Sequence, residues 1–299
     1  MAAQKHVRIG LVQLRPTTSR VENLETALDR TAEALENGAD VVCLPELFLT
    51  TYFCQTEDAA PFETAEPVPG PTTSRFLELA AEHDAVLVLS LFEERTAGLY
   101  HNTAAVIDGK RGYAGKYRKM HIPDDPKYYE KYYFAPGDLG FKNFDTPKVN
   151  CGVLICWDQW YPEAARLTAL RGAEILFYPT AIGWHPDERE SYGEAQHGAW
   201  EVSQRAHAVA NGCYVVAVNR VGFEPTPNAD DPDAGIQFWG QSFIVGPDGE
   251  VLYRCSDTEP EVAVVEIDLG RIAEIRHGWP FFRDRRIDEY GGLTRRFID

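Results

Sequence analysis

Short apolar segments that alternate with helical segments constrain the fold of this chain more than any other feature of its sequence. Val7–Gln13, Val41–Leu44 and Ala85–Phe92 have the length and the apolar side chains of buried strands. Gly38, just before the second of these, stands where a helix C-cap is expected. Ahead of it, apolar residues recur at steps of three and four, which is typical of a helix with one apolar face: Val21, Leu24, Leu28, Ala32 and Leu35. The alternation predicts an α/β protein built from layers of sheet and helix.

The second half of the chain repeats this alternation. Three further apolar runs are predicted strands: Val149–Ile155, Ile175–Tyr178 and Cys213–Asn219. Two helices are predicted between them, at Pro162–Leu170 and Glu194–Ala210, and Gly212 ends the second. Both halves therefore contain the strand–helix–strand unit of a layered α/β fold.

Two glycine turns and one long aperiodic stretch complete this outline. Asp108-Gly109 and Pro247-Asp248-Gly249 each separate two apolar runs and predict β-hairpins. Residues 119–144 are polar and aromatic without periodicity, and loops of this length are usually functional or disordered. The tyrosines and Phe134 in this stretch argue against disorder. No linker, charge block or repeat divides the chain. Residues 1–299 are therefore predicted to form a single domain, with its core at about 6–276.

The charge balance and the cysteines indicate the class of partner and the compartment. The chain has 29 Lys and Arg against 46 Asp and Glu, a formal net charge of −17, which disfavours nucleic acid and anionic membranes as partners. No segment approaches the ~18 uninterrupted apolar residues of a membrane helix. The start, MAAQKHVRIGLVQL, has no secretory core with a cleavage site. The 6 cysteines form no CxxC pair, so we expect reduced thiols and a cytoplasmic location.

The common cofactor and nucleophile motifs are absent from the sequence. There is no GxGxxG after a strand, no GxxxxGK(S/T), no HExxH and no GxSxG. The histidines also lack the spacing of metal ligands. Dinucleotide enzymes, zinc enzymes and serine hydrolases are therefore disfavoured.

Cys156 is the most informative single position. It stands where a buried strand ends, and a helix opened by Pro162 and Glu163 follows after a short turn. Backbone N–H groups and a helix N-terminus near such a turn can stabilise a thiolate or an oxyanion. An activated Cys156 is therefore expected to have a depressed pKa. The alternative is a buried structural cysteine, which is the common case.

Two further residues could assist such a nucleophile. Glu46 directly follows a buried strand and is flanked by apolar residues, so it could act as a general base. The alternative is a carboxylate at the rim of the fold or at a helix start. Lys119 follows a hairpin strand, and a lone lysine is more often solvated surface.

Taken together, the segments around these residues resemble the nitrilase, or carbon–nitrogen hydrolase, superfamily. Its members carry a glutamate, a lysine and a cysteine, each just after a core strand. The matching positions are Glu46 in LPELF, Lys119 in YRKMHIP and Cys156 in CWDQWYPEAAR. A second glutamate follows the lysine in this family, and Glu130 matches it. The similarity runs from about Val7 to the last helix.

The resemblance implies a fold and an assembly. The fold is a four-layer α-β-β-α sandwich in one domain. Such sandwiches often pair across their helices, which implies a homo-oligomer, and the C-terminal tail 277–299 is expected at a subunit interface. Trp279, Phe281, Phe282 and Tyr290 in this tail suit a buried contact. Neither a metal nor an organic cofactor is implied.

Longer matches resemble one branch of the superfamily, the N-carbamoylputrescine amidases. They are YRKMHIPDDPKYYEKYYFAPGD, ICWDQWYPEAAR and GAEILFYPTAIG. This branch hydrolyses the ureido C–N bond of its substrate to putrescine, ammonia and carbon dioxide. The β-ureidopropionase branch, which acts on N-carbamoyl-β-alanine, is the main alternative, followed by other carbamoyl amides and omega-amides. A non-catalytic binding or scaffolding member of the fold is a further alternative. Asp158 stands where the nitrile-cleaving branch typically has glutamate.

The resemblance also implies roles for the site residues. Glu46 takes the proton of Cys156, whose sulfur attacks the ureido carbon. Lys119 and the backbone N–H of Trp157 stabilise the oxyanion, and Glu130 orients the substrate and Lys119.

The group at the far end of the substrate distinguishes the candidate carbamoyl substrates from one another. A carboxylate would need an arginine, whereas an ammonium needs carboxylates or aromatic faces. The candidate loops contain more of the latter, although Arg189 and Lys127 also occur there. The predicted substrate-binding residues are Tyr52, Asp125, Tyr128, Trp157 and Glu188.

Overall fold

Two six-stranded sheets with the same pattern of strand directions form the centre of the protein, in a computed structural model that describes residues 6–299. The first sheet has the order β15-β1-β2-β3-β4-β5, and β1, β2 and β3 run parallel. The second has the order β14-β13-β10-β8-β7-β6, and β10, β8 and β7 run parallel. Antiparallel strands extend both sheets at their edges.

The strands of the first sheet are β1 (His6–Gln13), β2 (Val41–Cys43), β3 (Val86–Thr96), β4 (Leu99–Asp108), β5 (Gly112–Arg118) and β15 (Glu261–Asp268). Those of the second are β6 (Asn143–Asp145), β7 (Asn150–Val153), β8 (Ile175–Pro179), β10 (Tyr214–Val218), β13 (Phe243–Val245) and β14 (Val251–Arg254). A small third sheet contains β9 (Gly183–Trp184), β11 (Val221–Pro225) and β12 (Gly235–Trp239). The helices are α1 (Arg20–Glu36), α2 (Pro71–His83), α3 (Glu130–Tyr133), α4 (Pro162–Leu170), α5 (Pro186–Asn211), α6 (Gly270–Gly278) and α7 (Phe281–Asp284). Short 3-10 helices lie at Phe53–Gln55, Ala60–Thr64, Cys156–Trp160 and Tyr290–Thr294.

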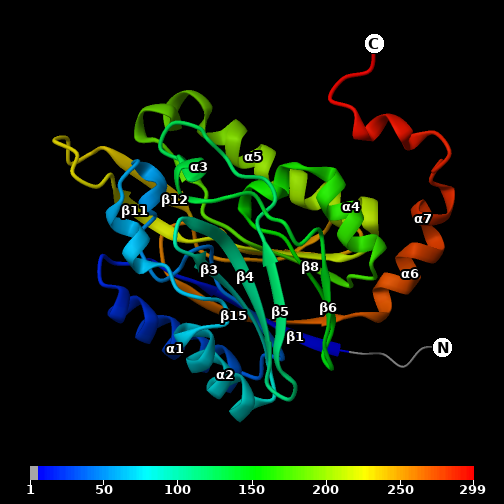
Figure 1. The fold of residues 1–299 in the computed structure, drawn as a ribbon. Helices are drawn as coiled ribbons and strands as arrows, with labels where there is room; N and C mark the ends of the chain where they lie inside the picture. The colour runs from blue at the N-terminus through cyan, green and yellow to red at the C-terminus, as the bar shows by residue number, and fades with distance from the viewer. Residues whose placement is uncertain (1–5) are drawn as a thin grey trace.

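The helices cover the outer faces of the two sheets (Figure 1). Along β3, Val86 and Val88 belong to the core that the two sheets share, whereas Leu87 and Leu89 pack in the cluster that includes α1 and α2. The helices α4 and α5 contact the second sheet. Because side chains alternate along a strand, each sheet is buried on both faces. The predicted α-β-β-α sandwich is confirmed.

The apolar face predicted for α1 is displaced in the structure. Val21 is 73% exposed, whereas Asn23, Ala27 and Thr31 are buried. The two polar residues are satisfied where they lie, since the Asn23 amide donates to the Leu49 carbonyl (3.0 Å) and the Thr31 hydroxyl to the Ala27 carbonyl (2.7 Å). A periodicity argument that counts only apolar residues cannot detect a face built from small and hydrogen-bonded side chains.

Several elements differ from those predicted from the sequence. Helix α5 begins at Pro186 rather than near Glu194, because its first turns are largely exposed and carry no apolar stripe. The hairpin β11–β12 was not predicted, and the stretch 119–144 contains α3 and β6. Residues of three of these elements, α3, α5 and β12, line the cavity described below.

The C-terminal segment beyond α6 runs outward from the sandwich, as the orange-to-red part of Figure 1 shows. Its exposed large apolar side chains are Trp279, Phe281, Ile287, Tyr290, Leu293, Phe297 and Ile298. The placement of this tail at a subunit interface stays a prediction. Within residues 6–299, no helix combines the length and the apolar character needed to cross a bilayer.

Candidate active site

The three residues singled out in the sequence meet at one edge of the sandwich. Glu46 follows β2, Lys119 follows β5 and Cys156 follows β7. Strands β2 and β3 run parallel, and the two antiparallel pairings β3–β4 and β4–β5 give β5 the same direction. Both strands of the first sheet therefore end at the same edge, where β7 of the facing sheet also ends.

Lys119 bridges two carboxylates in the interior. Its Nζ lies 2.7 Å from Glu46 Oε1 and 2.6 Å from Glu130 Oε2, and all three side chains are at most 1% exposed. Burial lowers the pKa of Lys119, but Glu130 and Glu46 raise it by more, so the pKa of this ammonium stands well above its usual value. Lys119 is therefore a fixed positive charge.

Glu130 opens α3 and is held from two sides. Its Oε1 accepts a hydrogen bond from the Tyr52 hydroxyl (2.7 Å), and Oε2 accepts one from Lys119. Burial raises the pKa of Glu130 to about 7, against the opposing effect of Lys119. Burial thus disfavours the ionised form of Glu130, and the Lys119 ammonium is the main group that opposes this effect.

Glu46 has one carboxylate oxygen in use and one free. Oε1 accepts from Lys119 and from the Asn102 amide (2.6 Å), which fixes the orientation of the side chain. Oε2 is buried and has no hydrogen-bond partner among residues 6–299. A buried carboxylate oxygen without a partner is a favourable proton acceptor.

Cys156 lies at the start of a tight turn with an uncommon backbone conformation. Its φ is +40°, in the left-handed region that non-glycine residues rarely adopt, and its Sγ lies 3.7 Å from the Ala181 carbonyl oxygen. The Asp158 carboxylate holds the turn by accepting from the Ile155 N–H (2.9 Å) and the Tyr117 hydroxyl (2.8 Å). It also lies 2.7 Å from His121 Nδ1.

The expectation of a depressed pKa for Cys156 is wrong. Burial raises the pKa of its thiol well above the usual value, and Glu46 adds to the rise, whereas Lys119 opposes it. A thiolate would be desolvated beside two carboxylates, so the resting state is a neutral thiol. Activation must therefore come from a base at the moment of attack.

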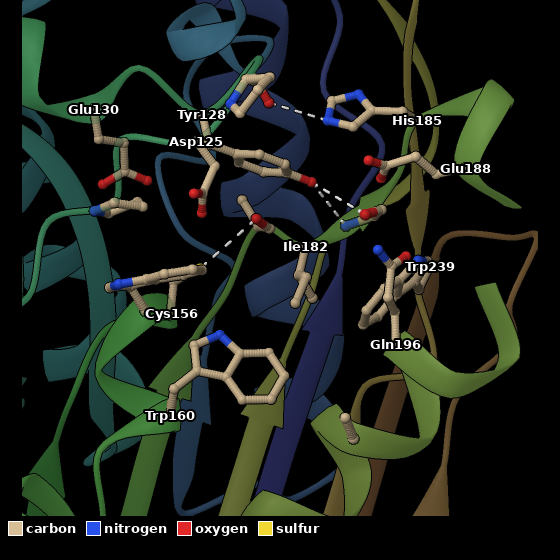
Figure 2. Close-up of a pocket in the computed structure, with 16 residues that line it drawn as sticks. Asp125, Tyr128, Glu130, Cys156, Trp160, Ile182, His185, Glu188, Gln196 and Trp239 are labelled. Carbon is tan, nitrogen blue, oxygen red and sulfur yellow. Dashed lines mark hydrogen bonds between the residues drawn. The ribbon is translucent and has the colours of Figure 1, made fainter. Parts of the chain in front are cut away.

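A cavity of about 410 Å³ opens over Cys156. Figure 2 shows Glu188 and Gln196 on the side opposite Cys156 and Glu130, with Asp125 and Tyr128 between them above the cavity. The lining comes from the segment after Lys119, the Cys156 turn, the segment after β8, the face of α5 and the end of β12. The lining residues are Pro123, Asp125, Pro126, Tyr128, Glu130, Cys156, Trp157, Trp160, Ala181, Ile182, Gly183, His185, Glu188, Gln196, Ala199 and Trp239.

Four of the five predicted substrate-binding residues line this cavity: Asp125, Tyr128, Trp157 and Glu188. Tyr52 does not line it. Tyr52 is fully buried behind Glu130, and its hydroxyl is committed to that carboxylate. Glu188 was expected in a loop but lies in the first turn of α5.

Several lining residues were not predicted as binding residues. Trp160 and Trp239 each carry a buried Nε1 with no hydrogen-bond partner within residues 6–299. His185 Nε2 lies 3.1 Å from the Pro126 carbonyl oxygen, which links α5 to the segment after Lys119. Trp239 ends β12, and because that strand was not predicted, nothing in the sequence places its indole at the cavity over Cys156.

The sequence of this chain matches a known family model. The model described as carbon-nitrogen hydrolase matches residues 8–277. The chain belongs to the carbon–nitrogen hydrolase family. This confirms the superfamily predicted from the three motifs and the predicted class of enzyme, a cysteine-dependent C–N hydrolase.

Relatives of this carbon–nitrogen hydrolase span nearly its whole length. An N-carbamoylputrescine amidase of Oryza sativa is 45% identical over 96% of this chain and 94% of that protein. A citrullinase of Francisella tularensis is 37% identical over 98% and 99%. Among solved structures, a carbon-nitrogen hydrolase from Helicobacter pylori matches with a TM-score of 0.94 at 46% identity, covering 98% of this chain and 100% of that one.

Proposed function

We propose that this hydrolase cleaves the ureido group of N-carbamoylputrescine to putrescine, ammonia and carbon dioxide. The reaction would proceed through a covalent S-carbamoyl intermediate on Cys156. The arrangement of a neutral thiol, a carboxylate with a free oxygen and a fixed ammonium in one buried site supports it. The relatives named N-carbamoylputrescine amidase support the choice of substrate.

In the first half-reaction Glu46 takes the Cys156 proton as the sulfur bonds to the ureido carbon. Lys119 and the Trp157 backbone N–H stabilise the oxyanion of the tetrahedral adduct, and one such donor is typically worth about 3 kcal/mol. When the adduct collapses, its C–N bond breaks and ammonia leaves with the proton held by Glu46. Glu130 orients the departing NH₂ group and keeps Lys119 in place.

In the second half-reaction Glu46 takes a proton from water, whose oxygen attacks the same carbon. Collapse breaks the C–S bond, and the proton returns to the Cys156 sulfur. The released carbamic acid decomposes to the amine and carbon dioxide. Glu46 thus serves as base and acid in turn. This requires a carboxylate whose orientation is fixed but which keeps one oxygen free to take up a proton.

The observation that carries the substrate assignment is the charge of the cavity lining. Asp125, Glu130 and Glu188 line it, and no lysine or arginine does within the described part of the chain. Arg189 lies instead over the Trp184 ring, 4.9 Å from its centroid. A distal ammonium would meet carboxylates and aromatic rings here, whereas a distal carboxylate would meet no cation. N-carbamoyl-β-alanine is therefore the less favoured substrate.

Ammonia release from N-carbamoylputrescine and N-carbamoyl-β-alanine, measured side by side with Cys156→Ala as the blank, tests this proposal. We expect kcat/KM to favour the amine substrate by at least about 100-fold. This ratio corresponds to about two to three kcal/mol of ionic recognition that the acid substrate lacks. Equal rates on the two substrates, or a preference for the acid, would overturn the assignment.

Citrulline is a second candidate. It carries the same ureido group with both an ammonium and a carboxylate, and a relative at 37% identity is named citrullinase. The unpartnered indole N–H groups of Trp160 and Trp239 would suit an additional acceptor in the ligand. Citrulline as a third substrate in the same assay decides between the two, because a higher kcat/KM for citrulline would replace the first proposal.

We also propose that the exposed apolar tail after α6 assembles two or more copies in a reducing compartment such as the cytoplasm. All six cysteines lie within the described residues, and all are buried and unpaired. Light scattering of the full chain and of a chain ending at Gly278 tests the assembly. The same number of copies per particle in both proteins would contradict a role of the tail in assembly.

A further inference from the structure

A buried arginine lies behind the loop that carries Glu46. Arg220 follows β10, and its side chain is 0% exposed. Its Nη2 donates to the carbonyl oxygens of Glu46 (2.7 Å) and Leu47 (3.0 Å). Nη1 donates to the Thr50 carbonyl at 3.3 Å. One guanidinium thus binds three backbone carbonyls of the segment that begins at Glu46.

Glu224 completes this contact on the same segment. Its Oε1 lies 2.8 Å from Arg220 Nη1, and its Oε2 accepts a hydrogen bond from the Tyr52 backbone N–H at 2.6 Å. The pair therefore holds the segment 46–52 at both ends, by its first carbonyl and by its last amide. The Arg220 guanidinium also lies over the rings of Tyr52 and Phe238, with centroid distances of 5.7 and 5.2 Å.

The held segment supplies two elements of the candidate active site. Glu46 carries the free carboxylate oxygen, and the Tyr52 hydroxyl donates to Glu130. Between them Leu47 has a φ of +50°, a conformation that a leucine keeps only where its surroundings impose it. Because Arg220 binds the carbonyl oxygens of the two peptide groups joined at the Leu47 Cα, it is placed to impose that conformation.

We propose that Arg220 is a positioning residue that sets the direction of the Glu46 carboxylate toward Cys156 through the Glu46 and Leu47 carbonyls. Glu224 is its partner in this role. The inference rests on the proposed function of Glu46 as the base for Cys156. Arg220 itself touches neither the cavity nor the reacting atoms.

The geometry favours positioning over a contribution to stability alone. A buried ion pair stabilises a fold weakly, because desolvation offsets the attraction of its charges. A planar guanidinium, however, offers several donors in fixed directions, which a lysine ammonium on a flexible chain does not. The neighbouring Asn219 acts similarly on the Cys156 side, since its amide binds Ile182 N and O at 3.0 Å each, next to the carbonyl of Ala181.

The test is Arg220→Lys, which keeps the buried positive charge and removes the planar guanidinium with its several fixed donors. Its matched control is Arg276→Lys, since Arg276 also donates to two backbone carbonyls, Asn211 (3.2 Å) and Gly212 (3.1 Å), at the far end of α5. Alkylation of Cys156 by iodoacetamide is followed by mass spectrometry in the full-length proteins. The amount labelled at completion counts intact sites, and the rate constant reports how well Glu46 serves the thiol. Glu46→Gln sets the floor of that rate.

We expect Arg220→Lys to lower the Cys156 alkylation rate and kcat per intact site by about 10- to 100-fold, with KM within about twofold. Arg276→Lys should leave all three unchanged. Loss of intact sites in Arg220→Lys, with normal rate constants at those remaining, would show a purely structural role and overturn the proposal.

A second variant keeps the proposal testable if Arg220→Lys does not fold. Glu224→Gln retains the shape of the partner and removes its charge, and we expect a smaller loss of about 3- to 10-fold in the same rate constants. Unchanged rate constants in Glu224→Gln would then count against the proposal. Alkylation needs no substrate, so it tests the positioning role separately from the proposed function. If no carbamoyl substrate is turned over but the alkylation rate still depends on Glu46, the proposed function is overturned and the positioning role stands.

Discussion

Lys119 Nζ lies 2.7 Å from Glu46 Oε1, and both side chains are fully buried. The same ammonium lies 2.6 Å from Glu130 Oε2, so one buried cation serves two buried carboxylates. Burial raises the pKa of the Cys156 thiol, and the excess negative charge adds to this rise, so the thiol is protonated at rest. The relationship makes Glu46 a base that acts on a neutral thiol, rather than the partner of a preformed thiolate.

Lys119→Met should reduce both activity and stability. It removes the oxyanion donor, which we expect to lower kcat by at least about 100-fold while KM changes little. It also leaves two buried carboxylates without their cation, and the free energy of unfolding should fall by about 3 kcal/mol. Steady-state kinetics and urea unfolding measure the two effects. Lys148→Met, which removes partly exposed ion pairs with Asp40 and Asp84, is the control and should cost at most about 1 kcal/mol. A rise in KM alone would contradict the oxyanion role of Lys119.

Glu46→Gln should abolish most turnover while preserving the fold. The amide keeps the shape and can still accept from Lys119, but it cannot take the Cys156 proton, and we expect a loss of about 10²- to 10⁴-fold in kcat. The measurement is ammonia release under saturating substrate, compared with Cys156→Ala as the variant without a nucleophile. Activity within about tenfold of the wild type would mean that another group serves as the base.

Glu188→Gln and Asp125→Asn should weaken recognition of the distal ammonium. Both carboxylates line the cavity, so we expect KM for N-carbamoylputrescine to rise by about tenfold in each variant, with kcat within about twofold. Glu190→Gln changes an exposed residue of α5 outside the cavity and is the matched control. Equal effects of Glu188→Gln and Glu190→Gln would indicate only a general change in surface charge.

Stability at acidic pH should depend on Glu93. Burial raises the pKa of this carboxyl, but hydrogen bonds from Arg118 and Lys116 lower it by more, to about 2, from 4.5. The unfolded chain therefore binds a proton at Glu93 before the folded chain does. The stability that Glu93 contributes is present above pH 4.5 and is lost as the pH falls toward about 2.

Glu93→Gln provides the measurement. Its free energy of unfolding in urea should lie below that of the wild type at about pH 6, and the difference should shrink steadily at about pH 4 and pH 3. A difference that is the same at all three values would mean that hydrogen bonding, rather than the charge, carries the contribution of Glu93.

The sequence predicted the regular parts of the fold well. Strand β8 is a continuous apolar run because both of its faces are buried, and α4 begins at Pro162 and ends at Leu170, as predicted. Glu46, Lys119 and Cys156 were found because each stands directly after such a strand, in a short motif that a family resemblance could match. These features are local, and local sequence is sufficient to detect them.

The tertiary structure alone decided which groups face one another and in which protonation state. Tyr52 supports Glu130 and does not touch the cavity, because Arg220 and Glu224, from elsewhere in the chain, hold the segment 46–52 in place. The raised pKa of the Cys156 thiol depends on burial and on carboxylates that lie far away in sequence. Desolvation and Coulomb interactions act through space, so a motif can name the reacting residues, but only their packing sets the charge that each of them carries.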